Sequence, residues 1–164
     1  MKSSRLVLLI LWLSPLLLLP AVAQADSLYS ANSGGNSIGV YSINATTGAL
    51  TFVEVDSANG APIEVVVHPS GKFLYSANSG VQTIGVYSIN PTTGGLTFVQ
   101  LAGTNGNPSG VAVDPTGKFL YSANSGGFSI GVYSINATTG ALTLVESEPA
   151  GGNPISVDIR YTAP

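Results

Sequence analysis

Three stretches of this sequence are nearly identical: LYSANSGGNSIGVYSINATTGALT at residues 28–51, LYSANSGVQTIGVYSINPTTGGLT at 74–97 and LYSANSGGFSIGVYSINATTGALT at 120–143. They start at residues 28, 74 and 120, so one unit recurs every 46 residues. Residues 27–54 and 119–146 differ at only three positions. Agreement over this length does not arise by chance, and it indicates that the chain was built by duplicating one structural unit.

Each unit has the pattern of four short strands separated by turn-forming residues. In the middle unit the strand-like runs are rich in Val, Ile, Tyr, Phe and Thr, and they cover residues 62–68, 72–78, 83–90 and 96–101. Proline and glycine lie in the turns between them, where proline fixes the backbone and glycine relaxes it. A repeat of roughly 40–50 residues with four strands is typical of a propeller blade. We therefore predict an all-β fold of three four-stranded antiparallel β-propeller blades.

The order of the strands is shifted within the repeat. The first unit starts at its second strand, residues 28–32, and the sequence finishes with an isolated first strand at 154–161. We expect this last strand to complete the three-stranded first unit, because such pairing removes free sheet edges. Propellers usually have about 4–8 blades, and three blades leave a ring hard to close. Two chains joined end to end would make six blades, so a homodimer is one hypothesis; an open three-blade arc and a fragment of a longer protein are the alternatives.

The first 25 residues have the features of a cleavable signal peptide. Lys2 and Arg5 are followed by an apolar run at residues 6–19 and by small residues that place cleavage near Ala23 or Ala25. The alternative is a membrane anchor, but this run is shorter than the roughly 20 apolar residues that span a bilayer. We therefore predict a secreted or periplasmic protein whose propeller domain covers residues 26–164.

The remaining chain is acidic. It keeps three basic residues against all eight acidic ones, a net charge of −5 (3 − 8). This balance argues against binding to nucleic acid, whose phosphates need clustered Lys and Arg, and against binding to an anionic membrane surface. The chain has no cysteine, so packing and sheet hydrogen bonds must stabilise it without disulfides.

Two runs, DPTGKFLYSAN at residues 114–124 and IGVYSINATTGALT at 130–143, resemble the blade signature of the lactonase-type seven-bladed propellers. This family includes the propeller 6-phosphogluconolactonases and the fungal carboxymuconate cyclase. The resemblance implies a site in a central channel that opens a sugar-acid lactone with His, Arg and acidic side chains, and without a required metal. This sequence departs from the pattern, since it has three blades, one histidine and, after the signal peptide, one arginine.

Four residues at varying positions of the innermost strands are candidates for catalysis. Framework positions repeat, whereas positions of a site need not. One position holds Glu64, Gly110 and Ser156 in turn, and another holds His68, Asp114 and Arg160. Residues four apart on a strand share a face, so Glu64 and His68 form a candidate general base with its orienting group, and Arg160 is a candidate oxyanion ligand. The alternative is that His68 and Asp114 cap the turns that follow them.

Other features point away from catalysis. The sequence has no Gly-x-Ser-x-Gly motif and no cysteine nucleophile, and a single histidine excludes the common zinc sites, so we expect no metal and no cofactor. Tyr29, Tyr75 and Tyr121 recur in every blade, which favours packing between blades over stacking on a carbohydrate. We therefore favour a non-catalytic binding or scaffold module with a protein or glycan partner; the alternative is a lactonase-type hydrolase.

Overall fold

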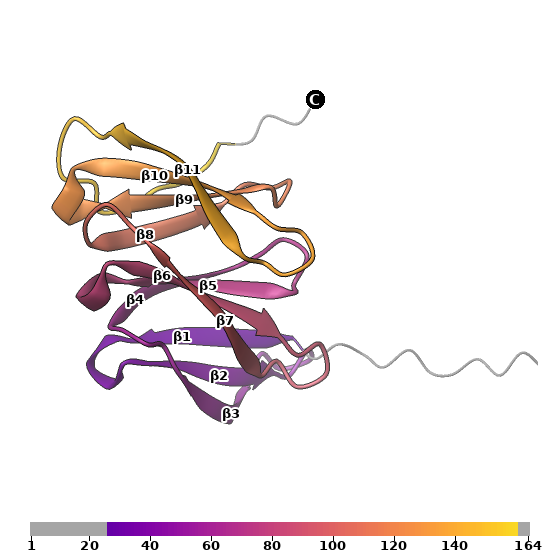
Figure 1. Cartoon of the computed structure of the whole chain (residues 1–164). Helices are drawn as coiled ribbons and strands as arrows, with labels where there is room; N and C mark the ends of the chain where they lie inside the picture. Colours follow the sequence, from indigo (N-terminus) through magenta and orange to yellow (C-terminus); the bar gives the residue numbers. More distant parts are fainter. Residues whose placement is uncertain (1–25, 161–164) are drawn as a thin grey trace, which may run out of the picture.

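The computed structural model describes residues 26–160, which form three antiparallel sheets stacked face to face like successive blades of a propeller (Figure 1). The predicted all-β propeller-blade architecture is thereby confirmed. No helix among these residues is long and apolar enough to span a membrane. The predicted signal peptide, residues 1–25, lies outside the described residues.

The first sheet has three strands, and the second and third have four each. The first comprises β1 (Ser27–Asn32), β2 (Ser37–Ile43) and β3 (Leu50–Ser57). The second comprises β4 (Pro62–Val67), β5 (Phe73–Asn78), β6 (Thr83–Ile89) and β7 (Leu96–Gly103). The third comprises β8 (Pro108–Val113), β9 (Phe119–Asn124), β10 (Ser129–Ile135) and β11 (Leu142–Pro149).

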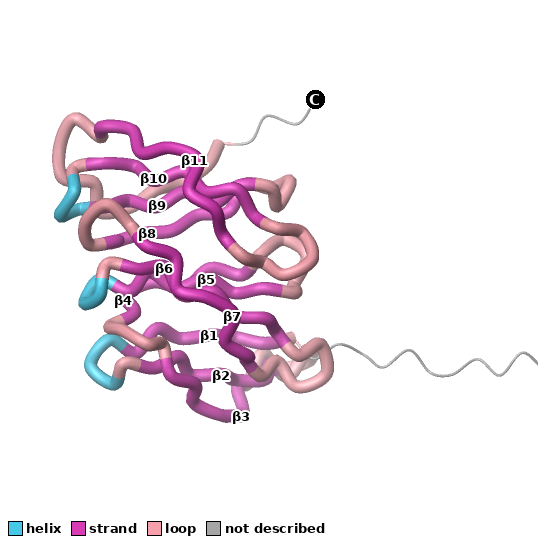
Figure 2. The backbone as a smooth tube through the Cα atoms, in the orientation of Figure 1, coloured by secondary structure: helices cyan, strands magenta, loops and turns pink. Residues whose placement is uncertain are grey.

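The turns on the two sides of the stack, where the strands of each sheet reverse direction, have different structures. On one side of the stack, short 3-10 turns (Ser33–Gly35, Ser79–Val81 and Ser125–Gly127) join β1 to β2, β5 to β6 and β9 to β10 (Figure 2). On the other side, the Asn44 carboxamide oxygen accepts hydrogen bonds from the backbone N–H groups of Thr46 and Thr47. Asn90 and Asn136 accept equivalent hydrogen bonds in the second and third sheets. The repeated Asn-x-Thr-Thr-Gly sequence therefore encodes a capped turn.

The hydrophobic core lies between successive sheets, so each sheet has two distinct faces. The face towards the following sheet, which we call the forward face, contributes Tyr29 and Ile38 of the first sheet and Tyr75 and Ile84 of the second to the core clusters. Tyr121 and Ile130 hold the equivalent positions in the third sheet. The face towards the preceding sheet, the rear face, contributes Leu74, Tyr87 and Leu96 of the second sheet and Leu120, Tyr133 and Leu142 of the third. Leu28, Tyr41 and Leu50 hold the equivalent positions in the first sheet. Forward and rear faces of neighbouring sheets interlock to form each core cluster.

The two ends of the stack are open within the described chain. β1 has a hydrogen-bonded neighbour only in β2, and residues 154–160 are not part of any sheet. These residues leave the third sheet at the end of the stack opposite to β1 (Figure 1). They run along β8, where the Ser109 hydroxyl donates to the Pro154 carbonyl at 2.9 Å. The expected completion of the first sheet by the C-terminal strand therefore does not occur within one chain.

Candidate functional site

The candidate residue Glu64 links two innermost strands. Its side chain extends from β4 to the next sheet, where its carboxylate accepts a 2.6 Å hydrogen bond from the backbone N–H of Val111 in β8. At the equivalent position of β8 stands Gly110, and a Cβ there would lie 3.2 Å from the Glu64 carboxylate. The variation between glutamate and glycine at this repeat position is therefore explained by the fit of neighbouring strands.

His68 is buried, with 9% of its surface exposed, and both of its ring nitrogens are engaged. Nδ1 accepts a hydrogen bond from the Ser70 backbone N–H at 3.0 Å, and Nε2 lies 2.9 Å from the carbonyl oxygen of Gly117 in the next sheet. Because an N–H can only donate and a carbonyl can only accept, these partners require the neutral ring with its proton on Nε2. His68 therefore ties the turn after β4 to the turn after β8.

Asp114 holds the turn after β8 through both carboxylate oxygens. Oδ1 accepts from the backbone N–H groups of Lys118 at 2.7 Å and Phe119 at 2.8 Å, and Oδ2 accepts from the backbone N–H and the hydroxyl of Thr116. Partial burial acts to raise the pKa of Asp114, but these hydrogen bonds outweigh it and lower the pKa below its ordinary value. The carboxylate is therefore kept ionised as a turn cap.

Replacing Asp114 with asparagine should destabilise the fold near neutral pH and have less effect in acid. Since the pKa of Asp114 is lowered in the folded state, its ionised form contributes stability above the ordinary value of 3.8, and this contribution is lost as the pH falls through the folded value. Thermal midpoints of the wild type and Asp114→Asn, measured from about pH 7 to about pH 3, should therefore converge. Asp26→Asn, at an exposed position, is the control, and a difference that stays constant with pH would contradict the assignment.

Arg160 stands apart from the other three candidates. It is exposed on the C-terminal segment and lines a hollow of about 340 Å³ on the forward face of the third sheet, together with Tyr121, Ile130, Val157, Asp158 and Ile159. Glu64, His68 and Asp114 instead bind backbone groups at separate places along β4 and β8. No convergent acid–base set is formed by the four residues within one chain, and their catalytic role stays a prediction.

The recurring tyrosines pack between blades. The Tyr29 hydroxyl donates to the Gly94 carbonyl at 2.8 Å, and the Tyr75 hydroxyl donates to the Gly140 carbonyl at 3.1 Å. Each bond therefore runs from the forward face of one sheet to a turn of the next. Tyr75 is fully buried, which leaves its ring no surface for stacking on a carbohydrate.

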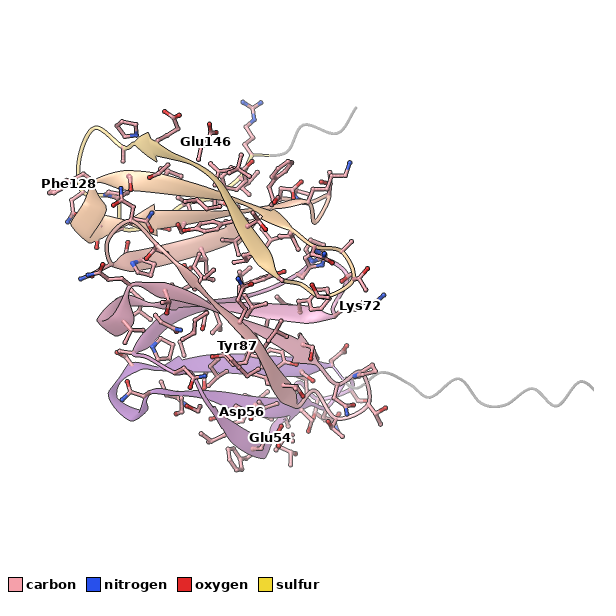
Figure 3. The ribbon with its side chains drawn as sticks, viewed as in Figure 1. Glu54, Asp56, Lys72, Tyr87, Phe128 and Glu146 are labelled. Atoms are coloured by element: carbon pink, nitrogen blue, oxygen red, sulfur yellow. The ribbon has the colours of Figure 1, made fainter. Side chains whose placement is uncertain are left out.

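A pair of carboxylates on the outer strand β3 was not among the predicted site residues. Glu54 and Asp56 are two residues apart and lie at the edge of the first sheet (Figure 3). Burial, and then the charge of Glu54, raise the pKa of Asp56, while a backbone hydrogen bond from Leu96 acts against them. One signal was available: Gln100 and Glu146 occupy the Glu54 position in the other units. Gln100 donates to the Leu142 carbonyl at 3.2 Å and accepts from its N–H at 2.9 Å, so this position links neighbouring blades.

A metal is not indicated by the side chains. Within residues 26–160 no group of three or more His, Cys, Asp or Glu residues is placed to hold a metal ion.

Comparison with known proteins relates these blades to a family. None of the curated proteins matches the chain. Among solved structures, a proposed 6-phosphogluconolactonase from Bacteroides uniformis superposes with a TM-score of 0.72 at 24% identity, covering 77% of this chain and 38% of its own. A periplasmic gluconolactonase from Pseudomonas aeruginosa gives a TM-score of 0.68 at 22% identity, covering 78% and 37%. A protein of unknown function from Desulfotomaculum acetoxidans gives 0.64 at 26% identity, covering 70% and 36%.

The chain thus spans between 36% and 38% of the length of these structures, which corresponds to a part of a complete propeller. The family model described as "Lactonase, 7-bladed beta-propeller" matches residues 61–159, from the start of the second sheet through most of the C-terminal segment. Because this match covers more than half of the sequence, the chain belongs to the seven-bladed β-propeller lactonase family.

Proposed function

We propose that this protein is an exported, non-catalytic binding module whose propeller blades present a surface to a protein partner. One observation carries the proposal: the ionisable side chains on the innermost strands β4 and β8, and directly after them, hold the framework together. Glu64 binds a neighbouring strand, His68 joins two turns through both ring nitrogens, and Asp114 caps its own turn. A general base needs a lone pair directed at its substrate, whereas His68 and Asp114 direct theirs at backbone N–H groups and Glu64 is anchored to a neighbouring strand through one carboxylate oxygen.

The surface that supports partner binding is the outer rim, defined by Phe52, Phe98 and Leu144. These residues stand at equivalent positions on β3, β7 and β11, and they are 58%, 49% and 55% exposed. Exposed apolar side chains that recur on the outer strands of successive sheets can form a patch of the kind that protein partners bind. The outer strands are also bulged at this point, next to Tyr41, Tyr87 and Tyr133, which discourages direct pairing of one outer strand with another.

A location outside the cytoplasm fits this proposal best. The residues before Asp26 have the composition of a signal peptide, and one structural relative is a periplasmic protein.

A lactonase-type hydrolase is the second candidate, and family membership favours it. In that case Arg160, the one candidate side chain that is exposed, would stabilise the developing oxyanion of a sugar-acid lactone. His68 is a poor residue for testing this reaction, because its replacement removes hydrogen bonds of the fold itself.

Two measurements separate the candidates. The purified protein should hydrolyse 6-phosphogluconolactone and gluconolactone no faster than water does. Immobilised protein should retain a partner from an envelope extract of the source cells, and the triple variant Phe52→Ser, Phe98→Ser, Leu144→Ser should lose it. The matched control Thr51→Ala, Thr97→Ala, Thr143→Ala changes exposed residues of the same three strands and should keep the partner. Hydrolysis above the spontaneous rate that Arg160→Ala abolishes would overturn the binding proposal and select the lactonase.

A further inference from the structure

The interfaces between sheets repeat the same contacts inside the chain. At both interfaces, a tyrosine hydroxyl of the forward face donates a hydrogen bond to a carbonyl 65 residues later: Tyr29 to Gly94, and Tyr75 to Gly140. At both interfaces, a tyrosine hydroxyl of the rear face donates to a carbonyl 30 residues earlier: Tyr87 to Ser57 at 3.3 Å, and Tyr133 to Gly103 at 2.9 Å. One interface is therefore defined by a fixed set of paired positions.

The two ends of the stack expose the two halves of this same interface. On the rear face of the first sheet, Leu28 and Leu50 are 38% and 49% exposed, whereas their equivalents Leu120 and Leu142 are 0% and 4% exposed. On the forward face of the third sheet, Phe119 is 38% exposed, whereas its equivalent Phe73 is 5% exposed. The rear face at one end is thus complementary to the forward face at the other.

The missing fourth strand of the first sheet has a matching segment at the other end of the chain. Residues 154–159 stand 92 positions after the residues of β4, and β4 pairs with β5 in a defined register, including Val65 with Ser76 and Val66 with Tyr75. Transferred by the repeat, that register pairs Val157 with Ser30, Asp158 with Tyr29 and Ile159 with Leu28. The segment already lies on the forward face of the third sheet, with Val157 beside Tyr121 and Ile130. This is the place that Val111 of β8 takes against the second sheet.

We propose that two copies of this chain join head to tail into a closed six-bladed ring, in which residues 154–159 of each copy form the fourth strand of the other copy's first sheet. The two contacts between the copies are identical, so a twofold axis closes the assembly with no exposed end. Six blades lie within the usual range of roughly 4–8, whereas a third copy would exceed it.

The ring gives defined partners to groups at the open ends. By the spacing of 65 residues, the Tyr121 hydroxyl donates to the carbonyl of Gly48 in the other copy. By the spacing of 30, the Tyr41 hydroxyl donates to the carbonyl of Pro149 in the other copy. Glu146 takes the position of Gln100 and accepts from the backbone N–H of Leu50 in the other copy, as Gln100 accepts from Leu142. These contacts depend only on assembly, so the ring forms in the same way whether it binds a partner or hydrolyses a lactone.

An engineered disulfide tests both the partner and the register. The chain has no cysteine, so the pair Ser30→Cys, Val157→Cys introduces the only thiols of the protein. Directly opposed residues of paired strands lie about 4.5–5.5 Å apart between Cα atoms, within disulfide range. We expect a covalent dimer on non-reducing gels after mild oxidation. The control Ser30→Cys, Asp158→Cys shifts the register by one residue, which places the two thiols on opposite faces of the sheet, and should not cross-link.

Light scattering after size exclusion supplies the second test, with the native protein expected at twice the chain mass. Val157→Asp puts a charge where Val111 is buried in the equivalent blade and should yield a folded monomer. Ile155→Asp is the matched control, because its equivalent Ile63 is 43% exposed in a complete sheet, and it should remain a dimer. A wild-type monomer, an open series of larger oligomers, or equal cross-linking of the two cysteine pairs would each overturn the proposal.

Discussion

Replacing Tyr75 with alanine should lower the free energy of unfolding by about 3–5 kcal/mol, as expected for deleting a buried aromatic ring. Tyr75 packs between the second and third sheets: its ring is fully buried, and its hydroxyl donates to the Gly140 carbonyl at 3.1 Å. Burial raises the pKa of this hydroxyl well above its ordinary value, so the group is neutral at all physiological pH values. A loss of this size is a large part of the roughly 5–15 kcal/mol that stabilises a typical domain.

Urea titrations followed by circular dichroism measure this loss, and two variants separate its parts. Tyr75→Phe keeps the ring and removes only the hydrogen bond, so it should cost about 1 kcal/mol. Phe98→Ala removes an aromatic ring that is 49% exposed on β7, the outer strand of the same sheet, and its cost should stay near that of a surface substitution, about 0.5 kcal/mol. Equal losses for Tyr75→Ala and Phe98→Ala would show that the interface between the sheets does not carry the stability.

The repeat made the blade architecture predictable, because the strands and turns of a blade are local features of 46 residues. The strand-like run 62–68 became β4 (Pro62–Val67), and the run 96–101 became β7 (Leu96–Gly103) with two further residues at its end. A single spacing located all three sheets. The roles of the variable residues were not predictable in the same way, because they depend on contacts between blades. His68, for example, bonds to Gly117, 49 residues away and in another sheet.

The 3-10 turns that join β1 to β2, β5 to β6 and β9 to β10 show a further limit of prediction from the sequence. The glycine pair at Gly34 and Gly35 predicts a turn there, but the left-handed backbone position falls one residue later, on Asn36. The same position is Gln82 in the second sheet and Phe128 in the third, with φ values of 54° and 51°. The short 3-10 turn, rather than glycine itself, sets this conformation. Phe128 projects into solvent on the side of the stack where the 3-10 turns lie (Figure 3) and is 59% exposed.

Replacing Gly85 with alanine should also destabilise the protein, by about 1–3 kcal/mol, the usual cost of overpacking a core. Its backbone is of ordinary conformation, so the alanine would by itself gain about 0.4–1 kcal/mol through the unfolded state. The packing decides against it. A Cβ at Gly85 would lie 2.5 Å from the Ser76 hydroxyl oxygen and 2.9 Å from the Tyr87 ring. Ser76 is 0% and Tyr87 1% exposed, so neither side chain can swing into solvent.

A matched control and a rescue variant test whether this clash is the cause. Gly34→Ala changes an exposed turn residue whose added Cβ would meet nothing within 4 Å, and it should leave the urea midpoint nearly unchanged. Ser76→Ala removes the nearer of the two obstacles, although it also removes the 2.9 Å hydrogen bond from Ser76 to Asn78. The double variant Ser76→Ala, Gly85→Ala should therefore be more stable than the sum of the two single losses predicts, because the two sites are in contact. Strictly additive losses of stability, or a Gly85→Ala variant more stable than the wild type, would show that a clash between strands β5 and β6 is not the cause.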